Sequence, residues 1–550
     1  MSFSKNILTL SILAIASSTT FAEEEAKVQQ LATIEIKAHP LERNAADFAV
    51  ADHVVEQKEL TEKSVTLGDA LAGEMGIHTN QFGAGSSRPV IRGQDGARVK
   101  VLQNASENID VSTLSPDHAV TVDPLLAKKI EVIQGPSTLL YGAGTVGGLV
   151  NVTDSKIPTQ MPENGYEGNV GLRYNTGSDE KLASAGVTVG LGDQVALRLE
   201  GLKREANDYI APDYFHEGEK ERRVDNTFAK GQTINVGLSW IYDRGFTGIS
   251  YSNRQDQYGL PGHSHEYESC HLHGLSLHCG DHDPNDAHNA GPWIDLKSER
   301  YDVRTELDNP FAGFKKLRAQ ASYTDYQHDE IEEETIATRF KNKGYDGRLE
   351  LVHNPLGAWE GVIGTQYGQQ KLKLTGEEAF LAPNTTKKWS VFALEHAQFN
   401  DVHVELAARA EQQKINIDDA TKKDFDGSAF SVSGAANWEF APNYKLSFVT
   451  SHQERLPLAQ ELYANGGHFA TNTYELGNDQ LKKEQSNNVE LGFHYDDNKF
   501  DYHVHVYHNW FDDYIYAQTL GHYKDFRLVQ YAQDKARFYG AEAEAAYQIS

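Results

Sequence analysis

Histidines and cysteines concentrate in one short stretch of the chain. Residues 263–293 read HSHEYESCHLHGLSLHCGDHDPNDAHNAGPW and contain both cysteines of the chain. The stretch also holds seven of the 23 histidines, namely His263, His265, His271, His273, His278, His282 and His288. Neutral imidazoles and carboxylates are ligands that Zn²⁺ accepts, although Cu²⁺ binds such ligands at least as tightly. The pattern therefore predicts a metal-binding loop without choosing the metal.

The charge and the N-terminus of the chain indicate what kind of protein carries this loop. The formal net charge is −28, with 79 acidic residues against 51 basic ones. This balance argues against nucleic-acid binding, which needs a basic surface, and favours a cationic partner. Residues 1–22 have a lysine, a short apolar run and small residues ending at Ala22, which is the layout of a secretory signal peptide.

Alternating hydrophobicity predicts strands from about Gly165 to the end of the chain. In FDYHVHVYHNW at 500–510, the apolar side chains of Phe500, Val504 and Trp510 share one face and polar side chains share the other. VALRLEGL at 195–202 and YKLSFVTS at 444–451 alternate in the same way. A soluble β-sandwich also alternates. The signal peptide and the length of the pattern favour an outer-membrane β-barrel.

Residues 23–160 lack this regular alternation, and their pattern predicts a separate α/β region. A helix is expected over 64–74 and strands over 99–102 and 129–133. We therefore predict a signal peptide at 1–22, an extended segment at 23–45, a plug domain at 46–160 and a barrel at 161–550. A wide barrel needs something to fill its lumen, which favours a plug; a separate periplasmic domain is the alternative.

Four motifs resemble those of one known family. SSRPVIRGQDGARVKVL at 86–102 and IEVIQGPSTLLYGAGTVGGLVNV at 130–152 are similar to plug motifs of TonB-dependent outer-membrane receptors. ERLPLAQELY at 454–463 and LGNDQLKKEQSNNVELG at 476–492 are similar to their barrel motifs. The resemblance implies an all-β transmembrane barrel of the 22-stranded type, with the plug inside its lumen. It also implies a Gram-negative outer-membrane location, contact with outer-membrane lipid, and TonB with ExbB and ExbD as partners.

A seven-residue segment before the plug looks like the TonB box of this family. ATIEIKA at 32–38 places Thr33, Ile34, Glu35 and Ile36 in an alternating, β-branched pattern. Such a segment suits addition as a strand to the edge of a partner's sheet. At the other end, the sequence reaches Ser550 while the alternation continues. We therefore expect further closing strands, because unpaired strand edges are not tolerated in lipid.

Import of a metal ion requires a site that encloses it between plug and barrel. SPDHAVTVD at 115–123 offers Asp117 and His118, and YQHDEIEEE at 326–334 offers His328 and Glu330. GGHFATN at 466–472 offers His468. Each of these alone would be an ordinary solvated residue, but their convergence would supply four nitrogen and oxygen ligands to one Zn²⁺. The zinc-uptake branch of the family is resembled by SPDHA at 115–119, YGLPGHSHEYESCH at 258–271, GPWIDL at 291–296 and SHQERLPLAQELYANGGHFATNTYELGN at 451–478. This resemblance implies Asp117, His118, Glu330 and His468 as ligands.

The two cysteines and the choice of cargo leave alternatives. In an exported chain Cys270 and Cys279 favour one disulfide, with thiolate ligation as the alternative. Haem uptake is the first rival to zinc uptake, because haem iron also takes axial histidine. A metal-sequestering surface protein or adhesin is the second. We expect no enzyme, since the sequence has no nucleophile elbow, HExxH pair or phosphate-binding loop.

Overall fold

The computed structural model describes most of the chain after residue 52. It covers Leu41 and residues 53–62, 65–216, 218–262, 267, 269–280, 291–332, 334–497 and 499–549. The predicted signal peptide and TonB box lie outside the described residues, as do Thr33, Ile34, Glu35, Ile36, His263, His265, His282 and His288. No helix among the described residues is both long and apolar enough to cross a membrane.

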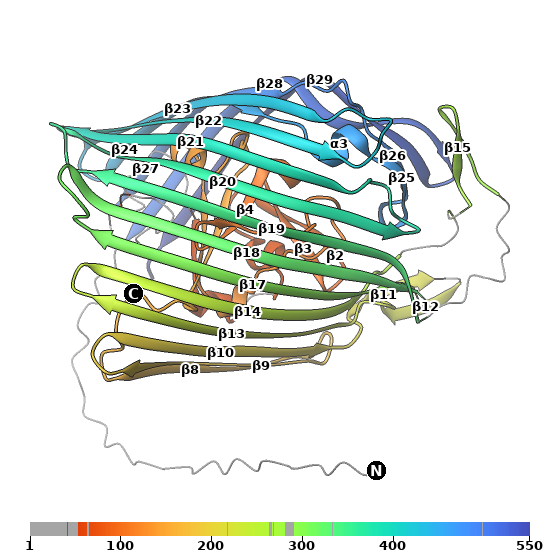
Figure 1. Cartoon of the computed structure of the whole chain (residues 1–550), viewed down its shortest axis with the longest axis horizontal. Helices are drawn as coiled ribbons and strands as arrows, with labels where there is room; N and C mark the ends of the chain where they lie inside the picture. Colours follow the sequence, from red (N-terminus) through yellow and green to blue (C-terminus); the bar gives the residue numbers. More distant parts are fainter. Residues whose placement is uncertain are drawn as a thin grey trace, which may run out of the picture. The chain divides into compact units, whose positions relative to one another are not determined.

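A large barrel-like sheet of antiparallel strands forms the outer wall (Figure 1). Its long strands, in chain order, are β8 (Tyr166–Asn175), β9 (Glu180–Leu191), β10 (Val195–Ala206), β13 (Ala229–Tyr242), β14 (Gly245–Gly259), β17 (Trp293–Asp308), β18 (Phe314–Glu332), β19 (Thr335–His353), β20 (Trp359–Gly376), β21 (Asn384–Phe399), β22 (Val402–Ile417), β23 (Phe425–Ala441), β24 (Tyr444–Arg455), β27 (Glu484–Asp496), β28 (Phe500–Tyr523) and β29 (Phe526–Tyr547). The predicted barrel of alternating strands is confirmed.

Short helices and hairpins lie at one end of this wall. The helix α3 (Ala459–Tyr463) leads into a hairpin of β25 (Asn465–His468) and β26 (Thr473–Leu476), and β26 pairs in parallel with β29. Two further hairpins are β11 (Ile210–His216) with β12 (Glu219–Arg223), and β15 (His271–His273) with β16 (Ser276–His278). The long connections that follow β14 and β24 both begin at this end, which we call the loop end.

The wall is apolar outside and polar inside. On β28, His505 and Asn509 are 0% and 3% exposed, whereas the alternating Val506 is 55% exposed. On β10, Arg198 is buried while Leu199 is exposed. A soluble sandwich would bury the apolar face instead, so this polarity identifies a barrel whose outer face suits lipid.

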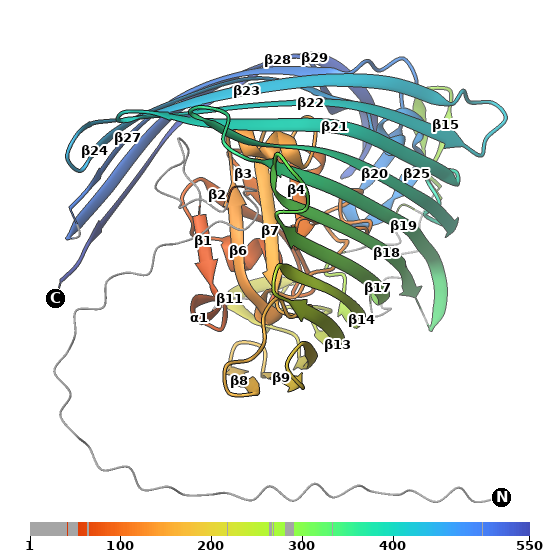
Figure 2. The same ribbon diagram turned by 60° about the vertical axis from the view of Figure 1, so that its left-hand side comes forward.

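The plug is a small α/β unit that lies within the curve of the wall (Figure 2). Its sheet has the order β1-β6-β7-β4-β5, from β1 (His53–Glu56), β4 (Val99–Gln103), β5 (Ser106–Glu107), β6 (Ala127–Ile133) and β7 (Gly148–Asp154). Two short helices, α1 (Gln57–Leu60) and α2 (Leu67–Leu71), and a hairpin of β2 (Ile77–Phe82) and β3 (Ser86–Ile91) accompany it. The helix predicted over 64–74 is shorter, because Ala72 is extended and Gly73 has a positive φ of 103°.

Buried arginines join the plug to the wall. Arg92 lies 2.7 Å from Glu490 on β27 and 2.8 Å from Glu542 on β29, and Arg98 pairs with Glu484. Arg88 instead pairs with Asp95 of the plug itself, at 2.9 Å. The polar lumen therefore supplies the carboxylates that buried guanidinium groups need.

Replacing Arg92 by methionine should loosen the plug. Glu490 and Glu542 would then face each other without a counter-charge, which costs about 3–5 kcal/mol. We expect the denaturant midpoint of the purified protein to fall accordingly. Arg222→Met is the matched control, because Arg222 makes only an exposed ion pair with Asp213, worth at most about 1 kcal/mol; equal effects of the two changes would contradict the prediction.

Candidate metal centre

Three separate segments bring five of the predicted metal ligands together. Asp117 and His118 lie in the plug loop 108–123, His328 and Glu330 near the loop end of β18, and His468 at the end of β25. All five are at most 2% exposed. We call this set the plug–barrel cluster. Plug and wall therefore each contribute side chains to one buried location.

Local structure fixes where each of these side chains points. Alternation along β18 sends His328 and Glu330 to the same, inward face. The plug loop is tied to the wall by Tyr258 of β14, whose hydroxyl accepts from the Ala119 amide and donates to the Asp117 carbonyl, both at 3.0 Å. Ser115 also donates a short hydrogen bond to the Asp117 carboxylate.

The donor atoms of the plug–barrel cluster form two triads that share His118, namely Asp117–His118–His468 and His118–His328–Glu330, and within each triad the donor atoms lie within 4.8 Å of one another. His118 Nε2 lies 3.5 Å from Asp117 Oδ2 and 3.7 Å from Glu330 Oε1. His468 Nε2 lies 3.7 Å from Asp117 Oδ1, and His328 Nε2 lies 3.8 Å from Glu330 Oε1. Tetrahedral ligands at the usual zinc distances are separated by roughly 3.3 Å. These atoms are thus too far apart for hydrogen bonds and close to the spacing of a shared metal.

The four atoms that face the centre of the cluster have no hydrogen-bond partner. They are the Nε2 atoms of His118, His328 and His468 and the Oδ2 atom of Asp117, all fully buried. An unpartnered buried polar atom is costly, and in native proteins such atoms often indicate a missing ion or water. Their number in one place points to a ligand rather than to imperfect packing.

The other ring nitrogen of each histidine is held by a neighbour. His118 Nδ1 donates to the Val111 carbonyl at 3.1 Å, and His468 Nδ1 lies 3.3 Å from Glu475. His328 Nδ1 lies 2.7 Å from the Tyr326 hydroxyl. Metal-binding histidines usually have such an outer partner, which orients the ring and leaves Nε2 for the metal.

Aromatic side chains exclude water from the plug–barrel cluster. Phe340 packs 4.8 Å from the His118 ring and 4.5 Å from the His328 ring, and Phe380 stacks on His468 at 5.1 Å. Both phenylalanines are almost fully buried. A low-dielectric enclosure strengthens the attraction between carboxylates and a divalent ion.

Electrostatics prepare the cluster for a cation. Burial alone would raise the pKa of Asp117, but the imidazoles of His118 and His468 hold it below its usual value. Burial would lower the pKa of His468, but Glu475 and Asp117 outweigh it and raise the pKa to about 10. In the loop after β20, burial and the charge of Glu330 raise the pKa of Glu378 well above its usual range. In the ion-free state, a proton on His468 therefore supplies positive charge where a metal would.

Sequence reasoning missed several residues around the cluster. The sequence could have identified Tyr326, because Tyr326, His328 and Glu330 are spaced two residues apart and so share one face of a strand. Glu378 and Phe380 carried no such signal, since both reach the cluster from a distant segment, and Glu475 meets His468 only through the pairing of β25 with β26.

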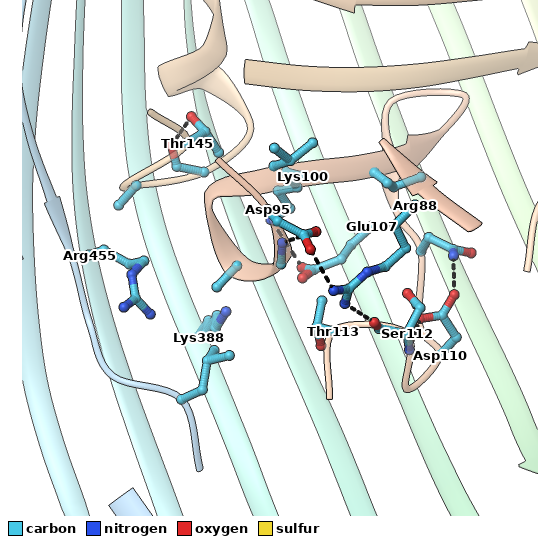
Figure 3. A pocket seen from close by; sticks show the side chains of 18 of the residues that line it. Arg88, Asp95, Lys100, Glu107, Asp110, Ser112, Thr113, Thr145, Lys388 and Arg455 are labelled. Atoms are coloured by element: carbon cyan, nitrogen blue, oxygen red, sulfur yellow. Dashed lines mark hydrogen bonds and ion pairs between the residues drawn. The ribbon is translucent and has the colours of Figure 1, made fainter. Parts of the chain in front are cut away.

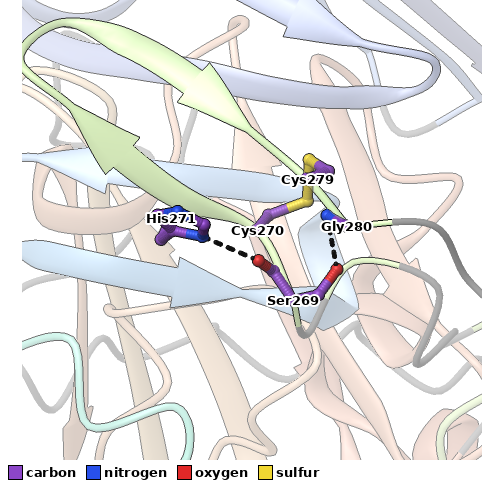
Figure 4. Close-up of a disulfide and its surroundings, with 5 residues drawn as sticks. All are labelled: Ser269, Cys270, His271, Cys279 and Gly280. Atoms are coloured by element: carbon purple, nitrogen blue, oxygen red, sulfur yellow. Dashed lines mark hydrogen bonds between the residues drawn. A yellow bond between two sulfur atoms is a disulfide. The ribbon is translucent and has the colours of Figure 1, made fainter.

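The histidine-rich loop is only partly described. His271, His273 and His278 lie on the hairpin β15–β16, with neighbouring ring centroids 4.8 to 6.5 Å apart. Cys270 and Cys279 are joined by a disulfide at the base of this hairpin (Figure 4). The base packs with Phe469 and Phe526 in one apolar group. Since Phe469 follows His468 directly, the hairpin is anchored beside the plug–barrel cluster.

A polar cavity of about 170 Å³ lies between plug and wall (Figure 3). Asp110 and Ser112 line it and belong to the same plug loop as Asp117. The other charged residues that line the cavity carry both signs and include Arg88, Asp95, Lys100, Glu107, Lys388, Glu411 and Arg455. The volume has room for several waters at roughly 10–15 Å³ each, and the cavity adjoins the loop that carries Asp117 and His118.

Family models match both parts of the chain. Residues 203–550 match the model described as TonB dependent receptor-like, beta-barrel, and residues 44–149 match the TonB-dependent receptor plug domain. The chain belongs to the TonB-dependent receptor family. The resemblance seen in the sequence motifs is confirmed at the level of the family, but these matches do not reach its zinc-uptake branch.

Individual relatives of this TonB-dependent receptor are distant. The ferrioxamine B receptor of Salmonella typhimurium is 28% identical over 211 residues, which are 36% of this chain and only 28% of that relative. The copper transporter OprC superposes with a TM-score of 0.72 at 16% identity, over 91% of this chain and 78% of OprC. The hemophore receptor HasR of Serratia marcescens gives a TM-score of 0.74 at 15% identity, over 91% and 80%. The two structures share the receptor's fold.

Proposed function

We propose that this receptor imports zinc ions across the outer membrane of a Gram-negative cell. One observation carries the proposal: the donor atoms of Asp117, His118 and His468, and those of His118, His328 and Glu330, form two triads within 4.8 Å that share His118, and the Nε2 atoms of the three histidines are buried without hydrogen-bond partners. Asp117, His118, Glu330 and His468 form the ligand set, and His328 is a fifth donor at its edge. Nitrogen and oxygen ligands of this kind suit Zn²⁺.

Transport would proceed by collection, capture and release. The acidic, histidine-rich loop raises the local concentration of cations outside the barrel. The plug–barrel cluster then holds one ion between plug and wall. TonB, energised with ExbB and ExbD, engages residues 32–38 and moves the plug. Because Asp117 and His118 belong to the plug, that movement separates them from Glu330 and His468 and releases the ion.

The surroundings of the cluster argue against haem or a siderophore as the captured ligand. HasR is described in complex with a hemophore and haem, and the Salmonella relative is a ferrioxamine B receptor. Both ligands are organic molecules that need a wide cleft. Here neighbouring donor atoms lie 3.5 to 3.8 Å apart in four pairs, with Phe340 and Phe380 packed against the imidazoles, which fits a bare ion. Copper would meet the same donors and is the nearest competitor.

Direct binding tests the proposal. The purified receptor should bind Zn²⁺ in calorimetric titration, and haem or ferrioxamine B in excess should not displace it. Asp117→Ala and His118→Ala should each remove the tight phase of the isotherm. Displacement of zinc by haem, or an isotherm unchanged by both substitutions, would end the proposal.

Zinc affinity should fall as the pH is lowered. Ligation needs a neutral His468, whose pKa of about 10 in the ion-free receptor means that each bound ion displaces a proton. One displaced proton weakens apparent binding about tenfold per pH unit, from about pH 8 to about pH 6. Titration in buffers of different ionisation enthalpy measures this proton directly. His468→Gln should abolish the released proton, and its persistence in that variant would refute the assignment.

A further inference from the structure

A second group of histidines lines the wall at the end opposite the loops. His494 lies on β27, and His503 and His505 lie on β28, close to Asp496 and Phe500, where the first of these successive strands ends and the next begins. We call these three residues the wall histidines. In outer-membrane barrels the short turns face the periplasm, so the wall histidines lie on the far side of the plug–barrel cluster.

The strand register places the wall histidines on one inward face. His494 is paired directly with His503, and Gly492 is paired with His505. Alternation then points all three imidazoles into the lumen. Gly492 has no side chain, and a Cβ there would lie 2.8 Å from His505 Cε1. The His505 ring therefore occupies the space over Gly492, toward His494.

The spacing of the rings suits a shared ion. The ring centroids of His494 and His505 are 4.8 Å apart, those of His494 and His503 5.7 Å, and those of His503 and His505 5.8 Å. Imidazoles bound through Nε2 to one tetrahedral zinc have centroids roughly 5 Å apart, given metal–nitrogen distances of 2.0–2.1 Å.

One nitrogen of this group is already free for a ligand. His505 is 0% exposed, and its Nε2 has no hydrogen-bond partner. Its Nδ1 lies 2.9 Å from Glu490, which Arg92 of the plug holds in place. This is the same arrangement of an anchored Nδ1 and an unpartnered Nε2 that is present in the plug–barrel cluster.

Carboxylates and the plug complete the surroundings. Glu544 of β29 lies 3.5 Å from His503 Nε2, and the Ser447 hydroxyl lies 3.5 Å from His494 Nε2. His53 of the plug strand β1 interacts electrostatically with His503, Glu542 and Glu544. The Glu544 carboxylate of the wall is thus available as a fourth ligand beside the three histidines. It lies near β1, the first described strand after the predicted TonB box.

We propose that His494, His503 and His505, with Glu544, form a second divalent-cation site, which receives the ion after it leaves the plug–barrel cluster. This inference rests on the proposed function for the direction of movement, but not for the binding chemistry. Two sites of the same ligand type, one on each side of the plug, would let an ion pass from one set of nitrogen donors to another. The ion would then not have to be released directly into water. Since β1 borders the second site, movement of the N-terminal part of the plug would change its surroundings.

Anomalous diffraction at the zinc absorption edge tests the inference on the intact receptor crystallised with Zn²⁺. We expect one peak in the plug–barrel cluster and another among the wall histidines. A peak in the plug–barrel cluster alone overturns this inference and leaves the proposed function standing. A peak among the wall histidines alone supports the second site and overturns capture by the plug–barrel cluster.

A variant provides an independent measurement in solution. In a background in which the seven loop histidines are replaced by glutamine, His503→Ala combined with His505→Ala should bind one zinc ion fewer per chain in equilibrium dialysis. His508→Ala is the matched control, because His508 is on the same strand but stacks on Trp510 on the outer face, with centroids 4.0 Å apart. An unchanged zinc count in the double variant would overturn the second site.

Discussion

His118→Ala should weaken zinc binding at the plug–barrel cluster by about 100-fold or more. His118 is the one residue common to both potential ligand groups, Asp117 with His468 and His328 with Glu330. Its loss removes a nitrogen ligand and leaves Asp117 and Glu330 facing a buried space with less compensation. Loss of an outer partner alone typically costs 10–100-fold in metal affinity, so loss of a ligand at the centre should cost at least as much.

Calorimetry in the background without loop histidines isolates this effect, because the loop then adds no binding of its own. Glu475→Gln should give a smaller loss, about 10–100-fold, since Glu475 holds the Nδ1 side of His468 and is not itself a proposed ligand. His452→Ala is the control, because His452 is partly exposed and hydrogen-bonds to Asn487 on the wall. If His118→Ala and His452→Ala bind zinc equally well, His118 is not a ligand.

Deleting residues 32–38 should abolish growth on limiting zinc while leaving zinc binding intact. The predicted TonB box at Thr33, Ile34, Glu35 and Ile36 would be the only link to the energy source, whereas the plug–barrel cluster is built from residues far along the chain. The deletion should therefore abolish zinc transport without changing zinc binding. Growth of a strain whose zinc uptake depends on this receptor, together with calorimetry on the purified variant, measures both.

Deletion of residues 24–30 is the matched control for this experiment. It removes the same number of residues between the predicted signal peptide and the box, and should leave growth unchanged. Growth of the box deletion at the control rate would favour a protein that sequesters metal at the cell surface over one that imports it.

The sequence alone determined the architecture and the residue types available for chemistry. Period-two alternation in segments such as 500–510 depends only on local pattern, so the strands and their faces were readable. The plug motifs and barrel motifs identified the family, and the local pairs Asp117-His118 and His328-x-Glu330 identified candidate ligands. Such signals survive in a linear sequence because each lies within a few neighbouring residues.

The tertiary structure decided which face is buried and which residues meet. Alternation is the same for a sandwich and a barrel, and burial such as that of His505 beside the exposed Val506 shows that the polar face lies inside. His118 and His468 are 350 positions apart in numbering, yet their ring centroids are 5.8 Å apart. Phe380 had no sequence signal, because its role arises from packing between distant segments, and Glu475 meets His468 only once β25 and β26 pair as a hairpin. A metal centre depends on distances of a few ångströms between such segments, and those distances exist only once the plug is seated in the wall.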